Sequence, residues 1–173
     1  MTRARPRRLF RALVVLAALA APAVAQEEKD VLRPCTMAEL VGTWEVVRFG
    51  AAPSARVDRS DPYFYPHQRY VFSADATMHH LTSKTPMTPA AHRALLSKAT
   101  PSRWAVDGTG RLLMQREGET RLETAACEVL TKEVIDPKTG VASPPGDVLL
   151  TRSDRAHKPV MRRQLRRLDG LGE

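Results

Sequence analysis

The chain has 173 residues, and its 27 Lys and Arg against 19 Asp and Glu give a formal net charge of +8. Five of the basic residues and none of the acidic ones lie in the first 25 positions, so the rest of the chain carries only +3. Such a mild charge argues against a nucleic-acid-binding protein. The remaining 148 residues suffice for one domain and not for two.

The first 25 residues predict a cleaved export signal. Arginines precede an apolar run from Leu13 to Ala21, and Ala23-Val24-Ala25 forms a small-x-small cleavage site. The run is shorter than the roughly 20 residues that a membrane span needs. We therefore expect cleavage after Ala25 and a periplasmic or secreted protein without a membrane span. Arg7-Arg8 leaves open whether export follows the general secretory or the twin-arginine route.

The chain has two cysteines, Cys35 and Cys127. In an oxidising compartment such a pair favours one structural disulfide, which would tie the N-terminal segment to the middle of the domain. A redox-active or metal-binding thiol pair is the alternative, although neither cysteine belongs to a C-x-x-C motif.

The expected domain begins at Thr36, after an N-terminal extension over residues 26–35, and ends at residue 168 before a C-terminal tail at 169–173. Thr36 and Glu39 have the spacing of a capping box, which predicts a helical turn before Leu40. Residues 41–49 follow with aromatic and β-branched side chains that favour a first strand.

Short apolar runs then alternate with turn signals. They predict further strands at 68–73, 77–82, 103–107, 112–116, 121–133, 148–152 and 159–167. A helix capped by Thr88-Pro89 interrupts them at 90–99. About eight strands in an antiparallel meander is the number at which a sheet commonly closes. The fold class is therefore all-β, an up-and-down barrel with one short helix.

Gly42-Thr43-Trp44, at the start of the first expected strand, resembles the G-x-W element of the lipocalin and fatty-acid-binding protein superfamily. The resemblance implies an exported bacterial lipocalin-like domain in which Trp44 is a structural plug at the closed end of the barrel. It also implies that an arginine of the last strand lies over the indole, for which Arg162, Arg163, Arg166 and Arg167 are all candidates. Finally it implies a lid over residues 50–67 that carries Tyr63, Phe64 and Tyr65.

Alternation along the strands points one set of side chains into the barrel. The expected interior residues, candidates to line a ligand cavity, are Tyr70, Phe72, Met78, Trp104, Val106, Leu112 and Met114. An eight-stranded barrel can hold one small ligand or be filled by its own side chains. The sequence leaves both interpretations open.

Met78, His79, His80, Met87 and His92 form a local cluster of side chains that suit copper or zinc. Adjacent residues on a strand point to opposite faces, so His79 and His80 do not serve one site, and we predict neither a metal nor a cofactor. The sequence has no G-x-S-x-G, H-E-x-x-H or G-x-x-x-x-G-K motif, and we assign no catalytic residue. Asp61, His67, Asp75 and His80 could meet in space in a folded barrel, but no spacing in the sequence requires it.

The C-terminal segment carries the densest positive charge of the expected domain. Its basic residues are Arg152, Arg155, Lys158, Arg162, Arg163, Arg166 and Arg167. We interpret them first as a basic edge strand that discourages sheet-to-sheet aggregation. The alternative is a site for an anionic headgroup or a partner protein.

Three hypotheses for the function follow. The first is a binding protein for a small hydrophobic or amphipathic ligand, and the second is a solid-barrel accessory or inhibitor protein that binds an envelope protein. The third is an enzyme with its site in the barrel. The ligand, the partner and the oligomeric state stay open.

Overall fold

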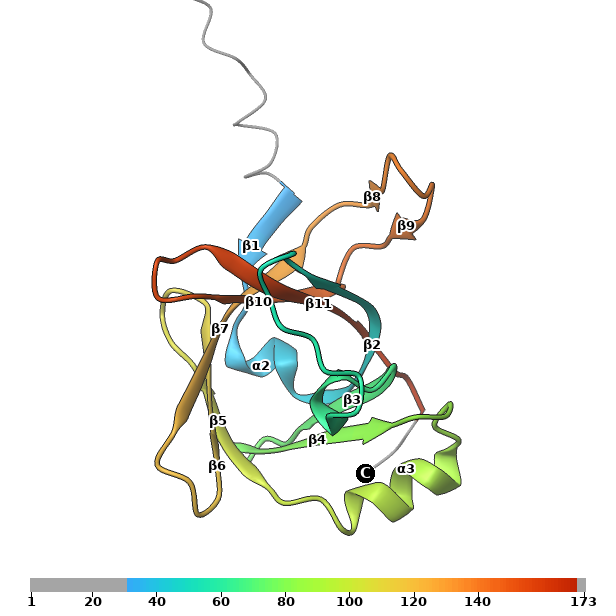
Figure 1. The fold of residues 1–173 in the computed structure, drawn as a ribbon, viewed down its shortest axis with the longest axis vertical. Coiled ribbons are helices and arrows are strands. Elements are labelled where there is room, and N and C mark those ends of the chain that lie inside the picture. The colour runs from blue at the N-terminus through green and yellow to red at the C-terminus, as the bar shows by residue number, and fades with distance from the viewer. Residues whose placement is uncertain (1–30, 171–173) are drawn as a thin grey trace, which may run out of the picture.

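The computed structural model describes residues 31–170, and its strands close into an antiparallel barrel (Figure 1). Each of eight strands pairs with the next, and the last pairs with the first. They are β2 (Gly42–Ala51), β3 (His67–Phe72), β4 (Thr77–Ser83), β5 (Ser102–Val106), β6 (Arg111–Arg116), β7 (Leu122–Leu130), β10 (Val148–Ser153) and β11 (Pro159–Arg167). The predicted all-β barrel is confirmed.

Residues 1–25, with the expected export signal and its cleavage site, lie outside the described residues. So do 26–30 and the last three residues of the expected tail. No helix within residues 31–170 is long and apolar enough to cross a lipid bilayer.

Several shorter elements accompany the barrel. β1 (Leu32–Pro34) pairs with the end of β7, so the expected N-terminal extension contributes a strand. β8 (Val134–Ile135) and β9 (Ala142–Ser143) form a separate hairpin that projects from the barrel between β7 and β10 (Figure 1). The helices are α2 (Met37–Leu40), α3 (Pro89–Leu96) and the short 3-10 helix η1 (Pro62–Phe64).

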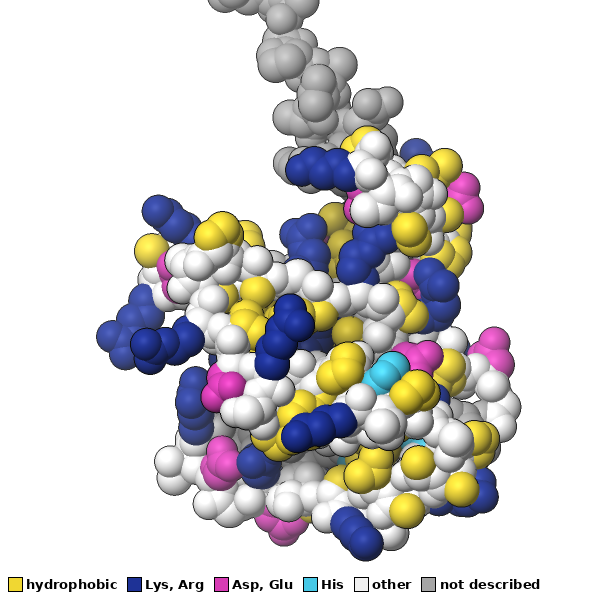
Figure 2. All heavy atoms as spheres, turned by 45° about the vertical axis from the view of Figure 1, so that its right-hand side comes forward, with side chains coloured by type: hydrophobic (Ala, Val, Ile, Leu, Met, Phe, Trp, Pro, Cys, Tyr) yellow, Lys and Arg dark blue, Asp and Glu magenta, His cyan; other side chains and the backbone are white. Residues whose placement is uncertain are grey.

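The basic C-terminal strand is internal to the closed sheet. β11 is hydrogen-bonded to β10 on one side and to β2 on the other. Its interpretation as a basic edge strand is therefore wrong, because a closed barrel leaves this strand no free edge. Lys and Arg side chains are spread over the face of the molecule shown in Figure 2, with Asp and Glu between them.

One end of the barrel is closed by α2, Trp44 and Arg167. Trp44 is 3% exposed, and its indole N–H donates to the carbonyl of Leu40 at 2.7 Å. The guanidinium carbon of Arg167 lies 4.8 Å from the centre of the indole ring, a cation–π arrangement. Arg167 also donates to the carbonyls of Glu39 (2.7 Å) and Val41 (3.0 Å). Among the four candidates, Arg167 is therefore the arginine over Trp44.

Gly42 makes room for this arrangement. Its φ is +132°, and a Cβ at this position would lie 2.7 Å from Nη1 of Arg167. Any other residue would be strained in the backbone and would push the guanidinium away from the indole. The glycine and the tryptophan of the G-x-W element thus serve one contact with the last strand.

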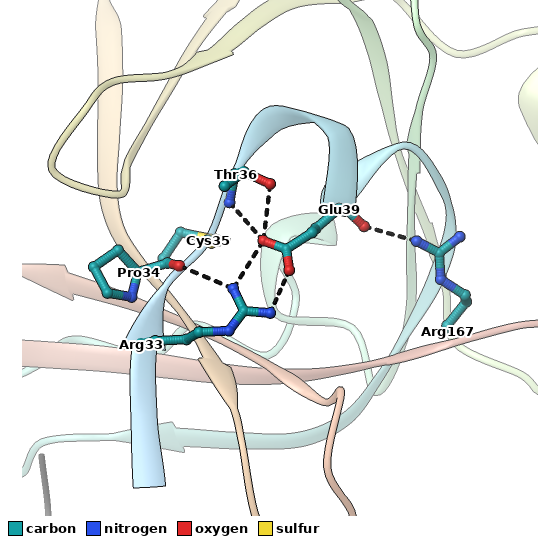
Figure 3. A network of polar contacts seen from close by, with 7 residues as sticks. Arg33, Pro34, Cys35, Thr36, Glu39 and Arg167 are labelled. Atoms are coloured by element: carbon teal, nitrogen blue, oxygen red, sulfur yellow. Dashed lines mark hydrogen bonds and ion pairs between the residues drawn. A yellow bond between two sulfur atoms is a disulfide. The ribbon is translucent and has the colours of Figure 1, made fainter. Parts of the chain in front are cut away.

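A polar network holds α2 in place (Figure 3). The carboxylate of Glu39 accepts hydrogen bonds from the backbone N–H of Thr36 (2.9 Å) and from its hydroxyl (2.8 Å). Thr36 is the N-cap of α2, and this return contact from Glu39 is part of a capping box. It also forms an ion pair with Arg33 of β1. Hydrogen bonds from Arg33, more than any other cause, lower the pKa of Glu39 to about 2. Strand β1 and helix α2 are thereby fixed to each other at the closed end.

A disulfide joins Cys35 and Cys127, as predicted. Both residues are buried, and the N–H of Cys35 donates to the carbonyl of Cys127 at 3.0 Å. The bond ties the segment between β1 and α2 to β7, across a sequence separation of 92 residues. Disulfides of this kind are typical of proteins outside the reducing cytosol.

Substitution of Trp44 by alanine tests its role as a plug. We expect Trp44→Ala to lower the free energy of unfolding by about 3 to 5 kcal/mol, because a buried aromatic side chain is removed and a cavity remains. Chemical denaturation measures the change. Val47→Ala on the same strand is the control, since Val47 is 42% exposed. A Trp44→Ala protein as stable as the control would show that the indole is not needed at this end.

Removal of the disulfide tests how much the Cys35–Cys127 bond stabilises the folded protein. Cys35→Ser should lower the free energy of unfolding, by up to about 4 to 5 kcal/mol in the chain-entropy account of so long a loop. Denaturation of the exported protein with and without reductant gives the size of the effect. Titration that finds two reactive thiols in the untreated wild-type protein would contradict the prediction.

Candidate functional site

The end of the barrel opposite α2 is covered by η1 and holds a cavity. Phe64 of η1 lies 6.0 Å, ring to ring, from Phe49 near the end of β2, and Tyr63 contacts Arg163 in the middle of β11. Beneath Tyr63 lies a cavity of about 130 Å³. Its apolar wall includes Met78, Met114 and Leu150.

The cavity reaches only part of the expected interior. Of the residues predicted to line it, Tyr70, Met78 and Met114 do so. The others lie elsewhere: Phe72, Trp104 and Leu112 belong to the buried core around Trp44, and Val106 packs against that core. Phe72 and Trp104 are in edge-to-face contact at 4.8 Å. The closed half of the barrel is thus filled by side chains, and the cavity lies toward the other end, where Tyr70 and Met78 also belong to the buried core.

The expected lid contributes one side chain to the cavity. Tyr63 lines it, whereas Phe64 and Tyr65 are not among its lining residues. Phe64 packs on Phe49, and the ring of Tyr65 lies 5.1 Å from the Nζ atom of Lys84.

Arg163 is the central charged group of the site and is 3% exposed. Its Nε donates to Oε1 of Gln68 at 3.0 Å, its Nη1 to the hydroxyl of Tyr63 at 2.9 Å, and its Nη2 to the carbonyl of Tyr63 at 3.0 Å. Its guanidinium carbon lies 4.2 Å from the centre of the Tyr63 ring. Within the described part of the chain, no Asp or Glu forms an ion pair with it. Arg163 is therefore a buried cation with neutral partners.

Arg152 of β10 is the second cation at this point. Its Nη1 donates to the hydroxyl of Tyr63 at 2.7 Å and lies 3.7 Å from Oε2 of Glu123. Two guanidinium groups thus share one phenol oxygen as their acceptor. Arrangements of this kind suit an oxygen that carries negative charge.

Gln68 and His80 complete the wall beside Arg163. The amide nitrogen of Gln68 donates to the carbonyls of Tyr63 (3.2 Å) and Tyr65 (2.7 Å), which turns Oε1 toward Arg163 and His80. Nε2 of His80 lies 3.0 Å from that oxygen and therefore carries the hydrogen. The His80 ring also stacks on Tyr70 with 4.4 Å between ring centres.

His80 is uncharged at neutral pH. Loss of contact with bulk water, followed by the positive charges of Arg163 and Arg116, lowers its pKa to about 3. Its hydrogen bond goes to the Gln68 amide, and no carboxylate pairs with it in the described part of the structure. Asp61 and Asp75 instead accept from backbone N–H groups of the turns that contain them. The geometry therefore offers no acid–base pair at His80.

The charged residues that line the cavity leave an excess of positive charge. Arg116 is paired with Glu119 at 3.3 Å, and Arg152 lies near Glu123. Arg121 and Arg163 also line the cavity, and neither has a carboxylate partner among residues 31–170. The site is thus electropositive and attracts anions.

The methionine and histidine cluster is divided between the two faces of β4. His80 lines the interior cavity, whereas His79 and His92 line a groove on the outer side, next to α3. Nδ1 of His79 and Nδ1 of His92 are buried and have no hydrogen-bond partner within residues 31–170. No group of three or more His, Cys, Asp or Glu in the described residues is arranged to hold a metal ion.

The sequence prediction did not place Gln68 or His80 in the cavity, and it linked Arg152 and Arg163 to a ligand only within the alternative of a site for an anionic headgroup. Strand alternation contained a signal for both arginines. Arg152 shares a face of β10 with Leu150, and Arg163 shares a face of β11 with Leu165. Because each arginine lies two positions from a buried leucine on the same strand, alternation indicates that its side chain points inward. Alternation contained the same signal for the other two, because Gln68 shares a face of β3 with Tyr70, and His80 shares a face of β4 with Met78.

Comparisons with family models, with curated proteins and with solved structures found no match.

The depressed pKa of His80 predicts a pH-dependent stability. The unfolded chain binds a proton near pH 6.5 and the folded chain near pH 3, so the contribution is fully present above pH 6.5 and is lost as the pH falls from there toward 3. We expect about 1 to 2 kcal/mol less stability at pH 5 than at pH 8 from this group. Denaturation of wild type and of His80→Gln at both pH values measures it. His157→Asn, at an exposed position, should keep the wild-type profile, and an equally steep profile in His80→Gln would contradict the assignment.

Proposed function

We propose that this protein is a periplasmic or secreted, lipocalin-like binding protein whose ligand is a small amphipathic molecule with an anionic headgroup. The ligand enters the open half of the barrel, and its headgroup binds Arg163 and Arg152. The observation that carries the proposal is Arg163, a buried guanidinium that contacts the lid over a cavity and has no carboxylate partner among residues 31–170.

Energetics favour an anion at this point. Burial of a cation without a counter-ion is costly, and neutral acceptors offset only part of that cost. A carboxylate or phosphate would accept charge-assisted hydrogen bonds from both guanidinium groups, which are about twice as strong as neutral ones. Met78, Met114 and Leu150 provide an apolar wall for the rest of the ligand. The site therefore combines one charged subsite with one apolar subsite.

The closed end supports the lipocalin-like kinship. Gly42, Trp44 and Arg167 have the arrangement that the resemblance implied, with the guanidinium over the indole and bonded to the carbonyls of the preceding helical turn. A barrel closed at one end, with a cavity toward the other, suits a binding protein.

A partner-binding role is the second candidate, because an apolar groove lies on the outer face of the barrel. Phe49, Leu130, Val134 and Leu149 line it, and Ile135 (60% exposed) and Val141 (52% exposed) extend it along the β8–β9 hairpin. Exposed apolar residues in one place are typical of protein contacts. A pull-down from envelope extract with wild type and Ile135→Asp would test this role, which fails if both proteins retain the same set of proteins.

Binding of octanoate tests the first proposal. Isothermal titration should detect octanoate and should give at least tenfold weaker binding of octanol, which has the same chain without the charge. Arg163→Met should weaken octanoate binding by about 10- to 100-fold, as expected for loss of hydrogen bonds to a charged group.

Arg162→Met provides the matched control. Arg162 neighbours Arg163 on β11 but lines the outer groove, so its loss should leave octanoate binding unchanged. Equal affinity for octanoate and octanol, or equal affinity of the two variants for octanoate, would overturn the proposal.

A further inference from the structure

The place between the two guanidinium groups is occupied by a side chain of the protein itself. The hydroxyl oxygen of Tyr63 accepts from Arg152 at 2.7 Å and from Arg163 at 2.9 Å. The ring lies over the Arg163 guanidinium at 4.2 Å, and it meets His80 edge-on with 5.9 Å between ring centres. The site thus already holds an aromatic ring with one oxygen directed at two cations.

We propose that Tyr63 is an internal substitute for the ligand, and that the ligand which displaces it is a small aromatic acid. In the complex an aryl ring takes the place of the phenol ring, and a carboxylate takes the place of the phenol oxygen. This inference rests on the proposed function, because it assigns the class of ligand for the same site and names Tyr63 as the side chain that the ligand displaces.

The contacts of Tyr63 explain why an aromatic acid fits. A guanidinium face and the edge of an imidazole both favour a planar π system. The phenol offers the two arginines one neutral oxygen, whereas a carboxylate offers two charged oxygens, one to each guanidinium. The cavity of about 130 Å³ beside the ring suits a compact ligand.

The attachment of η1 makes displacement feasible. η1 has three residues, its first turn is capped by Asp61, and most of residues 52–62 that precede it are exposed. Tyr63 holds η1 to the barrel through its bonds to Arg152, Arg163 and Gln68 and its ring contact with His80, and Phe64 does so by packing on Phe49. Gln68 also bonds the carbonyl of Tyr65, which keeps the C-terminal end of the segment in place when Tyr63 leaves.

Titration with benzoate tests the inference on the oxidised protein. Tyr63→Ala should bind benzoate at least tenfold more tightly than wild type, because no side chain has to be displaced. Tyr63→Phe, which keeps the ring and loses the shared acceptor, should bind it several-fold more tightly. Tyr65→Ala is the control and should match wild type, since the Tyr65 side chain lies outside the cavity.

Two neutral or non-aromatic probes define the ligand class. In Tyr63→Ala, 4-methylphenol has the shape of the lost side chain without the charge, and cyclohexanecarboxylate has the charge without the aromatic ring. Both should bind at least fivefold more weakly than benzoate. If cyclohexanecarboxylate binds as tightly as benzoate, the assignment to aromatic acids is overturned.

Whether Tyr63→Phe binds benzoate more tightly or more weakly than wild type decides whether Tyr63 competes with the ligand. This comparison holds even if Tyr63→Ala fails to fold. Weaker or unchanged benzoate binding by Tyr63→Phe would show that the hydroxyl does not compete with the ligand, which overturns the inference. Trypsin gives a second measurement on wild type: benzoate should speed cleavage after Arg56 and Arg59 as η1 is released, and slower cleavage contradicts displacement.

The two proposals fail in distinguishable ways. If Arg163→Met abolishes octanoate binding while the Tyr63 variants gain nothing for benzoate, the proposed function stands and this inference falls. If no anion binds in an Arg163-dependent manner to wild type or to either Tyr63 variant, the proposed function itself falls.

Discussion

The contact of Arg167 with Trp44 is the constraint on which the rest of the structure depends. β2 and β11 are the first and last strands of the barrel, and this contact joins them beyond the hydrogen bonds of their backbone. The same guanidinium holds the carbonyls of α2, so that helix, first strand and last strand are fixed together. With this end sealed, and with the disulfide tying it to β7, the opposite end is the one through which the interior opens.

β11 uses the same chemistry at both ends of the barrel. Arg163 and Arg167 lie four residues apart on its inward face, and each has its guanidinium over an aromatic ring, Tyr63 in one case and Trp44 in the other. The difference lies in what carries the ring. Trp44 belongs to a ten-residue barrel strand, whereas Tyr63 belongs to a three-residue helix in a largely exposed segment. One ring therefore belongs to the hydrogen-bonded sheet, and the other belongs to a short segment outside it.

Local patterns sufficed to predict the fold. The eight strands, the capped turn before Leu40 and the helix after Thr88 all depend on residues close in sequence, and the structure has each within a few residues of the predicted bounds. The disulfide followed from the number of cysteines. The pairing of β1 with β7 and the β8–β9 hairpin were missed because both are very short and depend on contacts with elements already folded.

The site was harder to predict than the fold. A register shift between Gln164 and Leu165 in the pairing of β11 with β2 decides which arginine meets which aromatic ring, and no local pattern encodes that shift. The division of the interior into a filled half and a half that contains the cavity depends on side-chain volumes from several strands at once. Local patterns therefore pointed to the arginines of the C-terminal segment as a group, but they did not show which arginine lies over Trp44 and which lies over Tyr63.

The neutrality of His80 follows from its burial and from the same arrangement of charge. Gln68 Oε1 accepts from both Arg163 and His80, so these two donors share one neutral acceptor. Burial is the main cause that lowers the pKa of His80 to about 3, and the positive charges of Arg163 and Arg116 add to it, because a proton on His80 would place a further cation beside them. The open half of the barrel is thus rich in donors and short of negative charge. An anion is the one kind of ligand group that would correct this imbalance directly.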